Sequence, residues 1–286
     1  MALGLTVLGS GSSGNATLLE ADGCAVLIDA GLGPRQIAKR MATVGVSWPR
    51  IHCVLLTHTH GDHWNDRTFA QLLRLRIPVW CHTAHLAALR AQSSCFAAMH
   101  RARLFRPYED GQKLSITSLV CCRPLAVRHD SGATFGFRLD GAANLFNSGW
   151  AMGYVCDLGC WHEPLADALA DVDVLAVEFN HDVALQRASG RAQQLIERVL
   201  SDDGHLSNEQ VAGFVSAVIQ RSSPARLSRL VQLHLSRQCN RPSLAQTAAR
   251  RALNEHDSPA LIHTSEQDHP TERLPLVALD SARGAA

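Results

Sequence analysis

The segment "VLLTHTHGDHWND", residues 54–66, constrains the fold of this chain more than any other. An apolar run at 53–57 has the composition of a buried strand, and four potential metal ligands follow it within six residues: His58, His60, Asp62 and His63. A loop at the end of a strand can turn such closely spaced side chains toward one point. Imidazole together with carboxylate suits zinc, and also manganese or iron. The segment therefore predicts a metal site at the end of a buried strand.

Further candidate ligands stand at the ends of three later apolar segments: His129 in "LAVRHDSG", Asp157 in "GYVCDLG" and His234 in "LVQLHLS". A catalytic metal keeps one coordination position open for water or substrate, so a single ion cannot use all of these side chains. Two metal ions that share the ligands are the natural solution.

The order of strand-like and helix-like segments predicts an α/β protein. Strands are expected at 3–8, 17–20, 24–28, 53–57, in several pieces between 103 and 156, at 229–236 and at 259–264. Helices are expected at 34–44, 65–75, 83–93, 161–170, 182–200, 208–221 and 243–254. No linker or repeat divides the chain, so one domain is expected over 1–280, with a frayed tail at 281–286. Two sheets packed face to face, with helices outside, fit this layered pattern.

Near the start, "GSGSSG" at residues 9–14 matches the G-x-G-x-x-G pattern of dinucleotide-binding loops. Such a loop must open a helix whose N-terminus holds the pyrophosphate. Here a strand follows, and Asp22-Gly23 then predicts a hairpin turn to the next strand. We therefore expect no nucleotide cofactor. The small polar residues could instead contact a phosphate backbone, which makes Ser12, Ser13 and Asn15 candidate substrate-binding residues.

Taken together, these motifs resemble the metallo-β-lactamase superfamily, whose H-x-H-x-D-H motif is present in full at residues 58–63. The chain is most similar to the YycJ/WalJ-like branch, on the segments "GSGSSGN", "THTHGDH", "EFNHD", "GHLSN" and "HLSRQCNRP", which span residues 9–242. It departs from that branch at Trp64-Asn65-Asp66, where glycine is usual, and at Cys156, where threonine is usual. The resemblance implies a four-layer αββα sandwich.

The resemblance also implies the metal ligands. One metal would be held by His58, His60 and His129, the other by Asp62, His63 and His234, and Asp157 would bridge them. His181 and His205 compete with His234 for the last position. Asp29, in "LIDAG", would support the metal loop from behind. The ions are expected to be two divalent metals, zinc first, with manganese or iron as alternatives.

Two such ions lower the pKa of a shared water and polarise the substrate, which is the chemistry of hydrolysis. Asp62, His205 and Glu178 are the expected catalytic residues. His205 resembles the proton-donating histidine of the tRNA-processing members of the superfamily, and Glu178 could orient it. His181 is a candidate for substrate binding, although a structural role explains it equally well.

The stretch from Gln210 to Asn254 contains seven arginines and no Asp or Glu. Guanidinium groups match phosphate oxygens, so Arg237 and Arg241, close to His234, are expected to bind substrate at the rim of the site. A solvated helix face is the competing explanation. We therefore expect a phosphodiesterase, and the resemblance implies a DNA exonuclease. A hydrolase of small substrates, such as a cyclic phosphodiester, lactone or thioester, is the alternative.

Nine cysteines lack any C-x-x-C pair, no secretory signal is evident, and no apolar run approaches the about 20 residues of a membrane helix. A cytoplasmic protein with reduced thiols and no membrane partner is expected. The oligomeric state cannot be read from the sequence, and a homodimer is kept as a hypothesis.

Overall fold

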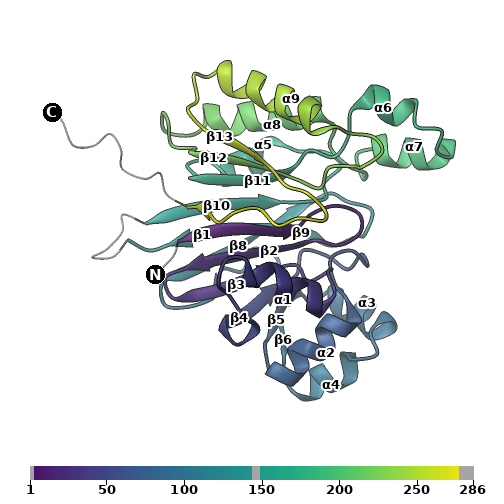
Figure 1. Ribbon diagram of the computed structural model, residues 1–286, viewed down its shortest axis with the longest axis vertical. Coiled ribbons are helices and arrows are strands. Elements are labelled where there is room, and N and C mark those ends of the chain that lie inside the picture. The colour runs from purple at the N-terminus through teal and green to yellow at the C-terminus, as the bar shows by residue number, and fades with distance from the viewer. Residues whose placement is uncertain (1–2, 144–148, 277–286) are drawn as a thin grey trace.

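The computed structural model describes residues 3–143 and 149–276, which fold around two seven-stranded sheets (Figure 1). The first sheet has the order β14-β1-β2-β3-β4-β5-β6. Its strands are β1 (Gly4–Gly9), β2 (Ala16–Ala21), β3 (Cys24–Ile28), β4 (Ile51–Leu55), β5 (Val79–His82), β6 (Phe105–Tyr108) and β14 (Leu274–Pro275). Strands β1 to β3 run antiparallel, and β3 to β6 run parallel.

The second sheet has the order β13-β12-β11-β10-β9-β8-β7. Its strands are β7 (Leu114–Ser115), β8 (Val120–Val127), β9 (Thr134–Gly141), β10 (Trp150–Val155), β11 (Val174–Glu178), β12 (Arg229–Leu233) and β13 (Leu261–Thr264). Strands β7 to β10 are antiparallel neighbours, and β10 to β13 are parallel.

Helices cover the outer face of each sheet, which gives four layers (Figure 1). The first sheet is covered by α1 (Pro34–Ala42), α2 (Asp66–Leu75), α3 (His85–Gln92) and α4 (Phe96–Arg101), and a short 3-10 turn, η1 (Trp48–Arg50), precedes β4. On the side of the second sheet lie α5 (Glu163–Ala168), α6 (Val183–Arg187), α7 (Gln193–Leu200), α8 (Asn208–Gln220) and α9 (Pro242–Asn254).

Three apolar clusters hold these layers together. One lies between the sheets, with Val26 and Phe137 facing each other's sheet, and the other two lie under the helices, around Phe69 and Phe214. Strands covered on both faces read as continuous apolar runs rather than as alternating patterns. The central strands β3, β10 and β11 are buried at every position, as this arrangement requires.

The predicted αββα sandwich is confirmed, and most elements lie where the sequence predicts them. The hairpin turn at Asp22-Gly23 joins β2 to β3, with both residues in the left-handed region. The helix predicted at 182–200 is wrong as a single element, because Gly190, with a φ of +69°, separates α6 from α7. Helix α4 and strand β5 had no prediction, and the predicted tail at 281–286 lies outside the described residues.

Among the helices of the described residues, none is both long and apolar enough to cross a bilayer.

The direction of the strands places the candidate ligands. In the first sheet β3 and β4 are parallel, so Asp29 and the loop after β4 leave the sheet at the same edge. In the second sheet β8, β10, β11 and β12 point the same way, and each is followed or ended by a polar candidate residue: His129, Asp157, Glu178 and His234. The carboxyl ends of parallel strands are the usual place for a binding site in such sheets.

Candidate metal centre

The loop at residues 57–63 is held from behind by Asp29, a fully buried carboxylate. One oxygen of Asp29 accepts the backbone N–H of Thr57 at 2.9 Å, and the other lies 2.7 Å from Nδ1 of His63. The hydroxyl of Thr57 lies within 3.0 Å of both oxygens. Burial raises the pKa of Asp29, against the opposing effect of His63. The Asp29 carboxylate thus holds the proton of His63 on Nδ1 and leaves Nε2 free to bind a metal.

Three residues of the site adopt left-handed backbone conformations just after their strands. Asp29 follows β3 with a φ of +60°, Asp157 follows β10 with +59°, and His234 follows β12 with +52°. Non-glycine residues rarely adopt this conformation, and where it persists the surroundings must enforce it. At these three positions it turns the side chain of the residue back toward the shared edge of the sheets.

The first ligand group consists of His58, His60 and His129, whose ligand atoms lie within 4.8 Å of one another. His129 is held by the carbonyl oxygen of Gly204, 2.9 Å from its Nδ1, which leaves Nε2 for the cleft. Nε2 of His58 is buried and has no hydrogen-bond partner. Burial and then the neighbouring His63 lower the pKa of His58 well below its usual value, so the ring is neutral. A neutral, orphaned ring nitrogen fits a metal ligand.

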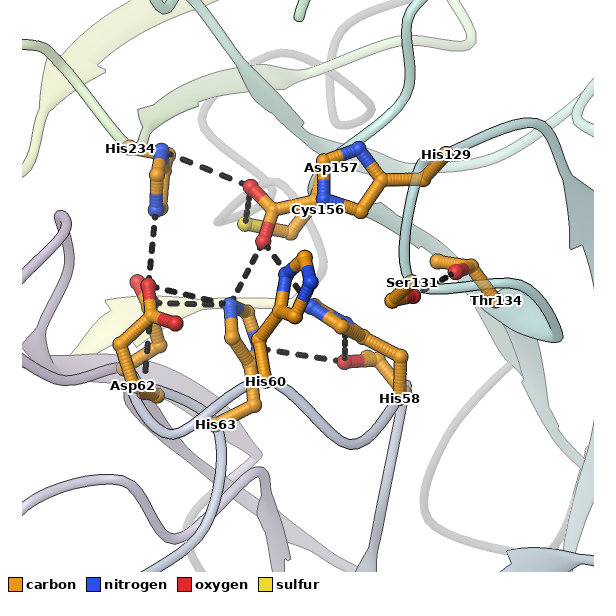
Figure 2. Close-up of polar contacts among 12 residues, drawn as sticks. His58, His60, Asp62, His63, His129, Ser131, Thr134, Cys156, Asp157 and His234 are labelled. Carbon is orange, nitrogen blue, oxygen red and sulfur yellow. Dashed lines mark hydrogen bonds and ion pairs between the residues drawn. The ribbon is translucent and has the colours of Figure 1, made fainter. Parts of the chain in front are cut away.

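The second group consists of Asp62, His63, Asp157 and His234, again within 4.8 Å (Figure 2). Nε2 of His63 lies 2.6 Å from Asp157, and Nε2 of His234 lies 3.4 Å from Asp62. Burial opposes protonation of His63, but Asp29 and Asp157 together raise its pKa well above the usual value. Without a metal, Nε2 of His63 therefore carries a proton next to the carboxylate of Asp157. A metal cation can take the place of this proton.

Asp157 lies between the two groups. Its Oδ2 is 3.5 Å from Nε2 of His58, and the same oxygen contacts His63 of the second group. Burial raises the pKa of this carboxyl, but His234 and His63 outweigh burial and hold the pKa well below its usual range. An ionised, buried carboxylate between two sets of imidazoles suits a bridging ligand. The donors present therefore fit two divalent ions.

Glu178 and His205 form a third possible ligand group together with Asp157 and His234 of the second group, with ligand atoms within 4.8 Å of one another. Oε2 of Glu178 is 3.0 Å from Nδ1 of His205, while Oε1 accepts the backbone N–H groups of Leu158 and Leu206. Burial lowers the pKa of His205, but Glu178 raises it further, to about 9. At neutral pH this imidazole is therefore protonated, and it lies 3.5 Å from Asp157.

The glycine-serine loop supports the ligands rather than facing a cofactor. It joins β1 to the antiparallel β2, so no helix follows it. Asn15 is fully buried, and its amide nitrogen lies 3.3 Å from Asp62 and 3.0 Å from Nε2 of His63. The hydroxyl of Ser10 accepts the backbone N–H of His234 at 2.9 Å. Asn15 therefore faces the candidate ligands, whereas Ser12 and Ser13 are exposed, and contact of these three residues with substrate stays a prediction.

The candidate substrate contact His181 lies in the interior of the structure. His181 is fully buried, belongs to none of the ligand groups found among the described residues, and has no hydrogen bond at either ring nitrogen. Burial lowers its pKa to about 4, so this ring is a neutral residue of the interior. His234, and not His181, lies within ligand distance of Asp62.

The arginines of 210–254 do not form a free basic stripe. Arg237 pairs with Asp268 at 2.5 Å, and Arg241 donates to the carbonyl oxygens of Gln238 and Asn240. Further along, Arg221, Arg226 and Arg251 pair with acidic side chains that directly flank this stretch or come from earlier segments: Glu163, Asp167, Asp173, Glu209 and Glu255. The fold therefore neutralises several of these arginines, and contact of Arg237 and Arg241 with substrate stays a prediction.

Asp130 is a site residue that has no prediction. Its Oδ1 lies 3.3 Å from Nε2 of His129 and 3.6 Å from Nε2 of His60, and its Oδ2 pairs with Arg198 at 3.1 Å. Its position next to His129 in "RHDSG" is the sequence feature that could have indicated it.

The structure also shows what the two residues that depart from the YycJ/WalJ-like pattern contact. The Trp64 indole donates to the carbonyl of Thr59, and Cys156 lies 3.7 Å from Asp157.

Comparisons with known proteins agree with this geometry. A family profile described as "Beta-lactamase superfamily domain" matches residues 25–227. Exodeoxyribonuclease WalJ of Streptococcus pneumoniae serotype 2 is 27% identical over 260 residues and 88% of each chain. Exodeoxyribonuclease YycJ of Bacillus anthracis is 25% identical over 260 residues, 89% of this chain and 90% of its own.

Among solved structures, the metallo-β-lactamase fold protein YhfI from Bacillus subtilis aligns with a TM-score of 0.64 at 13% identity. The alignment covers 93% of this chain and 98% of YhfI. The family profile covers more than half of the sequence, and the sandwich carries the expected His/Asp clusters at the shared edge of its sheets. The chain therefore belongs to the metallo-β-lactamase superfamily, as a metal-dependent hydrolase of its YycJ/WalJ-like branch.

Proposed function

We propose that this chain is a dinuclear phosphodiesterase that degrades DNA in an exonuclease-like manner in the cytoplasm. The observation that carries the proposal is the position of Asp157, whose carboxylate contacts both ligand groups. The WalJ and YycJ relatives match most of the chain and are both named exodeoxyribonucleases, which supports DNA as the substrate. The nine free cysteines fit a reducing compartment.

Zinc is the first choice for both ions, because imidazole and carboxylate donors without thiolates suit it, and manganese or iron is the alternative. When bound, two divalent ions supply a water of lowered pKa and polarise the phosphate oxygens. His58, His60 and His129 would hold one ion. Asp62, His63 and His234 would hold the other, with Asp157 shared.

The side chains of the protein contribute a proton donor, His205, and a residue that orients it, Glu178. His205 is protonated at neutral pH, and its Nδ1 is occupied by Glu178, so Nε2 is the nitrogen that can donate to a leaving oxygen. Glu178 also accepts the backbone N–H groups of Leu158 and Leu206, the residues that follow Asp157 and His205, which fixes the ring relative to Asp157. We assign His205 as the general acid and Glu178 as its positioning residue.

Residues 1–280 are proposed to act as one catalytic domain. The first sheet supplies the 58–63 loop, and the second supplies His129, Asp157 and His234. Neither sheet alone carries a complete set of ligands.

The proposal is tested by incubating metal-loaded protein with end-labelled duplex DNA, single-stranded DNA and a chromogenic phosphodiester, after elemental analysis of the bound metal. DNA should be shortened from an end, and His58→Ala should abolish this activity. His269→Ala is the matched control, because His269 has an exposed side chain and lies outside the ligand groups. Cleavage of the chromogenic ester alone would refute the nuclease and favour the small-substrate alternative.

A further inference from the structure

A second arginine-rich stretch lies in the first half of the chain. Between Arg67 and Tyr108 there is no Asp or Glu. The same stretch contains seven arginines, and all seven are exposed: Arg67, Arg74, Arg76, Arg90, Arg101, Arg103 and Arg106. We call these seven residues the α2–α4 basic face.

Unlike Arg221, Arg226, Arg237 and Arg251, these side chains form no ion pair with a described carboxylate. Among the residues that the structure describes, no carboxylate lies within ion-pair distance of any of the seven. Arg74 binds the neutral amide of Gln71, and Arg90 lies over the ring of Phe96 at 5.5 Å. The nearest acid in sequence, Asp66, is already used: its carboxylate accepts hydrogen bonds from Ser93 and Ser94.

Six of these residues lie on or next to α2, α3 and α4, and Arg106 lies on β6, at the end of the first sheet's strand order. Helices α2, α3 and α4 lie together on the outer side of the first sheet, at the end of the molecule opposite α8 and α9 (Figure 1). Arg67 stands in the first turn of α2, directly after the metal loop, and Arg74 stands in the last turn. The basic face therefore starts four residues after His63 in the chain and continues along α2, a helix whose length spans about 15 Å.

A hollow of about 380 Å³ interrupts this layer. Arg101, Arg103 and His100 provide its polar lining, and Leu86, Phe105 and Pro107 its apolar lining. Two guanidinium groups above an apolar surface suit a ligand that carries phosphate next to a flat base or a sugar.

We propose that the α2–α4 basic face binds the sugar-phosphate backbone of DNA and holds the strand that leads away from the metal centre. The inference rests on the proposed function for its choice of polyanion. Each strand of a DNA duplex carries one phosphate for every ~3.4 Å of the duplex axis, so 15 Å measured along that axis corresponds to roughly four phosphates of one strand. Unpaired, exposed guanidinium groups are the complement of such a strand.

The test compares two triple variants that remove the same charge. In Arg101→Ala/Arg103→Ala/Arg106→Ala the basic face loses three cations. In the control, Arg221→Ala/Arg250→Ala/Arg251→Ala, the three come from the opposite helical layer. Binding of a fluorescein-labelled oligonucleotide to the metal-loaded protein is measured by anisotropy over a series of salt concentrations, together with turnover of the chromogenic phosphodiester.

In the basic-face variant, the slope of log affinity against log salt concentration should become shallower by about 2 to 3, because each phosphate contact contributes about 0.7 to 0.9 to the steepness of that slope. Its turnover of the small ester should match that of the wild type, which shows an intact metal centre. An unchanged slope, or an equal fall in the control, overturns the inference, and so does binding to vesicles of anionic lipid without binding to DNA. If wild-type protein binds DNA through this face but does not cleave it, the proposed function fails and the inference stands.

Discussion

Replacing Asp29 by asparagine tests how the metal loop is oriented. Three donors converge on the two oxygens of Asp29: the N–H and O–H of Thr57, and Nδ1–H of His63. A carboxylate accepts all three, whereas an amide has one oxygen and one donating nitrogen. The Thr57 N–H retains the oxygen, so the amide nitrogen faces His63. His63 must then accept at Nδ1 and carry its proton on Nε2, the nitrogen that faces Asp157.

A protonated Nε2 cannot bind a metal, so the group of Asp62, His63 and His234 should lose affinity by about 10- to 100-fold, or about 1.4 to 2.8 kcal/mol. The group of His58, His60 and His129 should keep its affinity. Titration of apoprotein with zinc against a chromophoric chelator should therefore show one weakened and one unchanged step.

Asp66→Asn is the matched control for this titration, because Asp66 follows the same loop but binds Ser93 and Ser94 rather than a histidine. Two unchanged steps, or an equal weakening of both, would show that Asp29 does not select the tautomer of His63.

Three further predictions follow from single contacts. Glu178→Gln should lower the pKa of His205 from about 9, because burial is then opposed only by the weaker effects of Asp157 and Asp130; an NMR titration of the ring checks this. Burial lowers the pKa of His85 to about 4, so the folded state excludes its proton and loses stability as the pH falls from about 6.5 to 4. In His85→Asn the free energy of unfolding should fall less between pH 6.5 and 4, by up to roughly 3 kcal/mol, as measured by urea unfolding at several pH values. If the free energy of unfolding falls as steeply in the variant as in the wild type, His85 is not the cause of the fall. A Cβ at Gly31 would lie 1.8 Å from the backbone oxygen of Asp62, so Gly31→Ala should lower Tm and metal affinity, whereas Gly61→Ala, where nothing lies within 4 Å, should not.

The sequence predicts the layers and most of the ligand positions because both depend on local patterns. Apolar runs of strand length, broken by helices, leave few arrangements other than stacked layers. His58 to His63 lie within six residues, so their proximity needs no tertiary information. His129, Asp157 and His234 could be inferred because each ends an apolar run, and parallel strands end at the same edge.

Charge pairing could not be predicted in this way, because it depends on contacts between distant segments. The stretch around Arg221 and Arg251 reads as basic, but its partners come from α5, α8 and the segments between them. Asn15 reads as an exposed loop residue, and only the approach of Asp62, 47 residues away, buries it. Gly190 can end a helix, but the helical pattern of the residues on both sides of it predicts one continuous helix.

The division of ligands between the two sheets makes metal binding a matter of folding as well as of chemistry. The loop after β4 and the ends of β8, β10 and β12 reach one point only when the sheets are docked, so an ion bound there cross-links the two halves of the sandwich. A ligand that binds the docked state alone stabilises it by mass action. Chelation should therefore weaken the packing of the two sheets against each other, and the stability of the docked sheets should rise with the concentration of available metal.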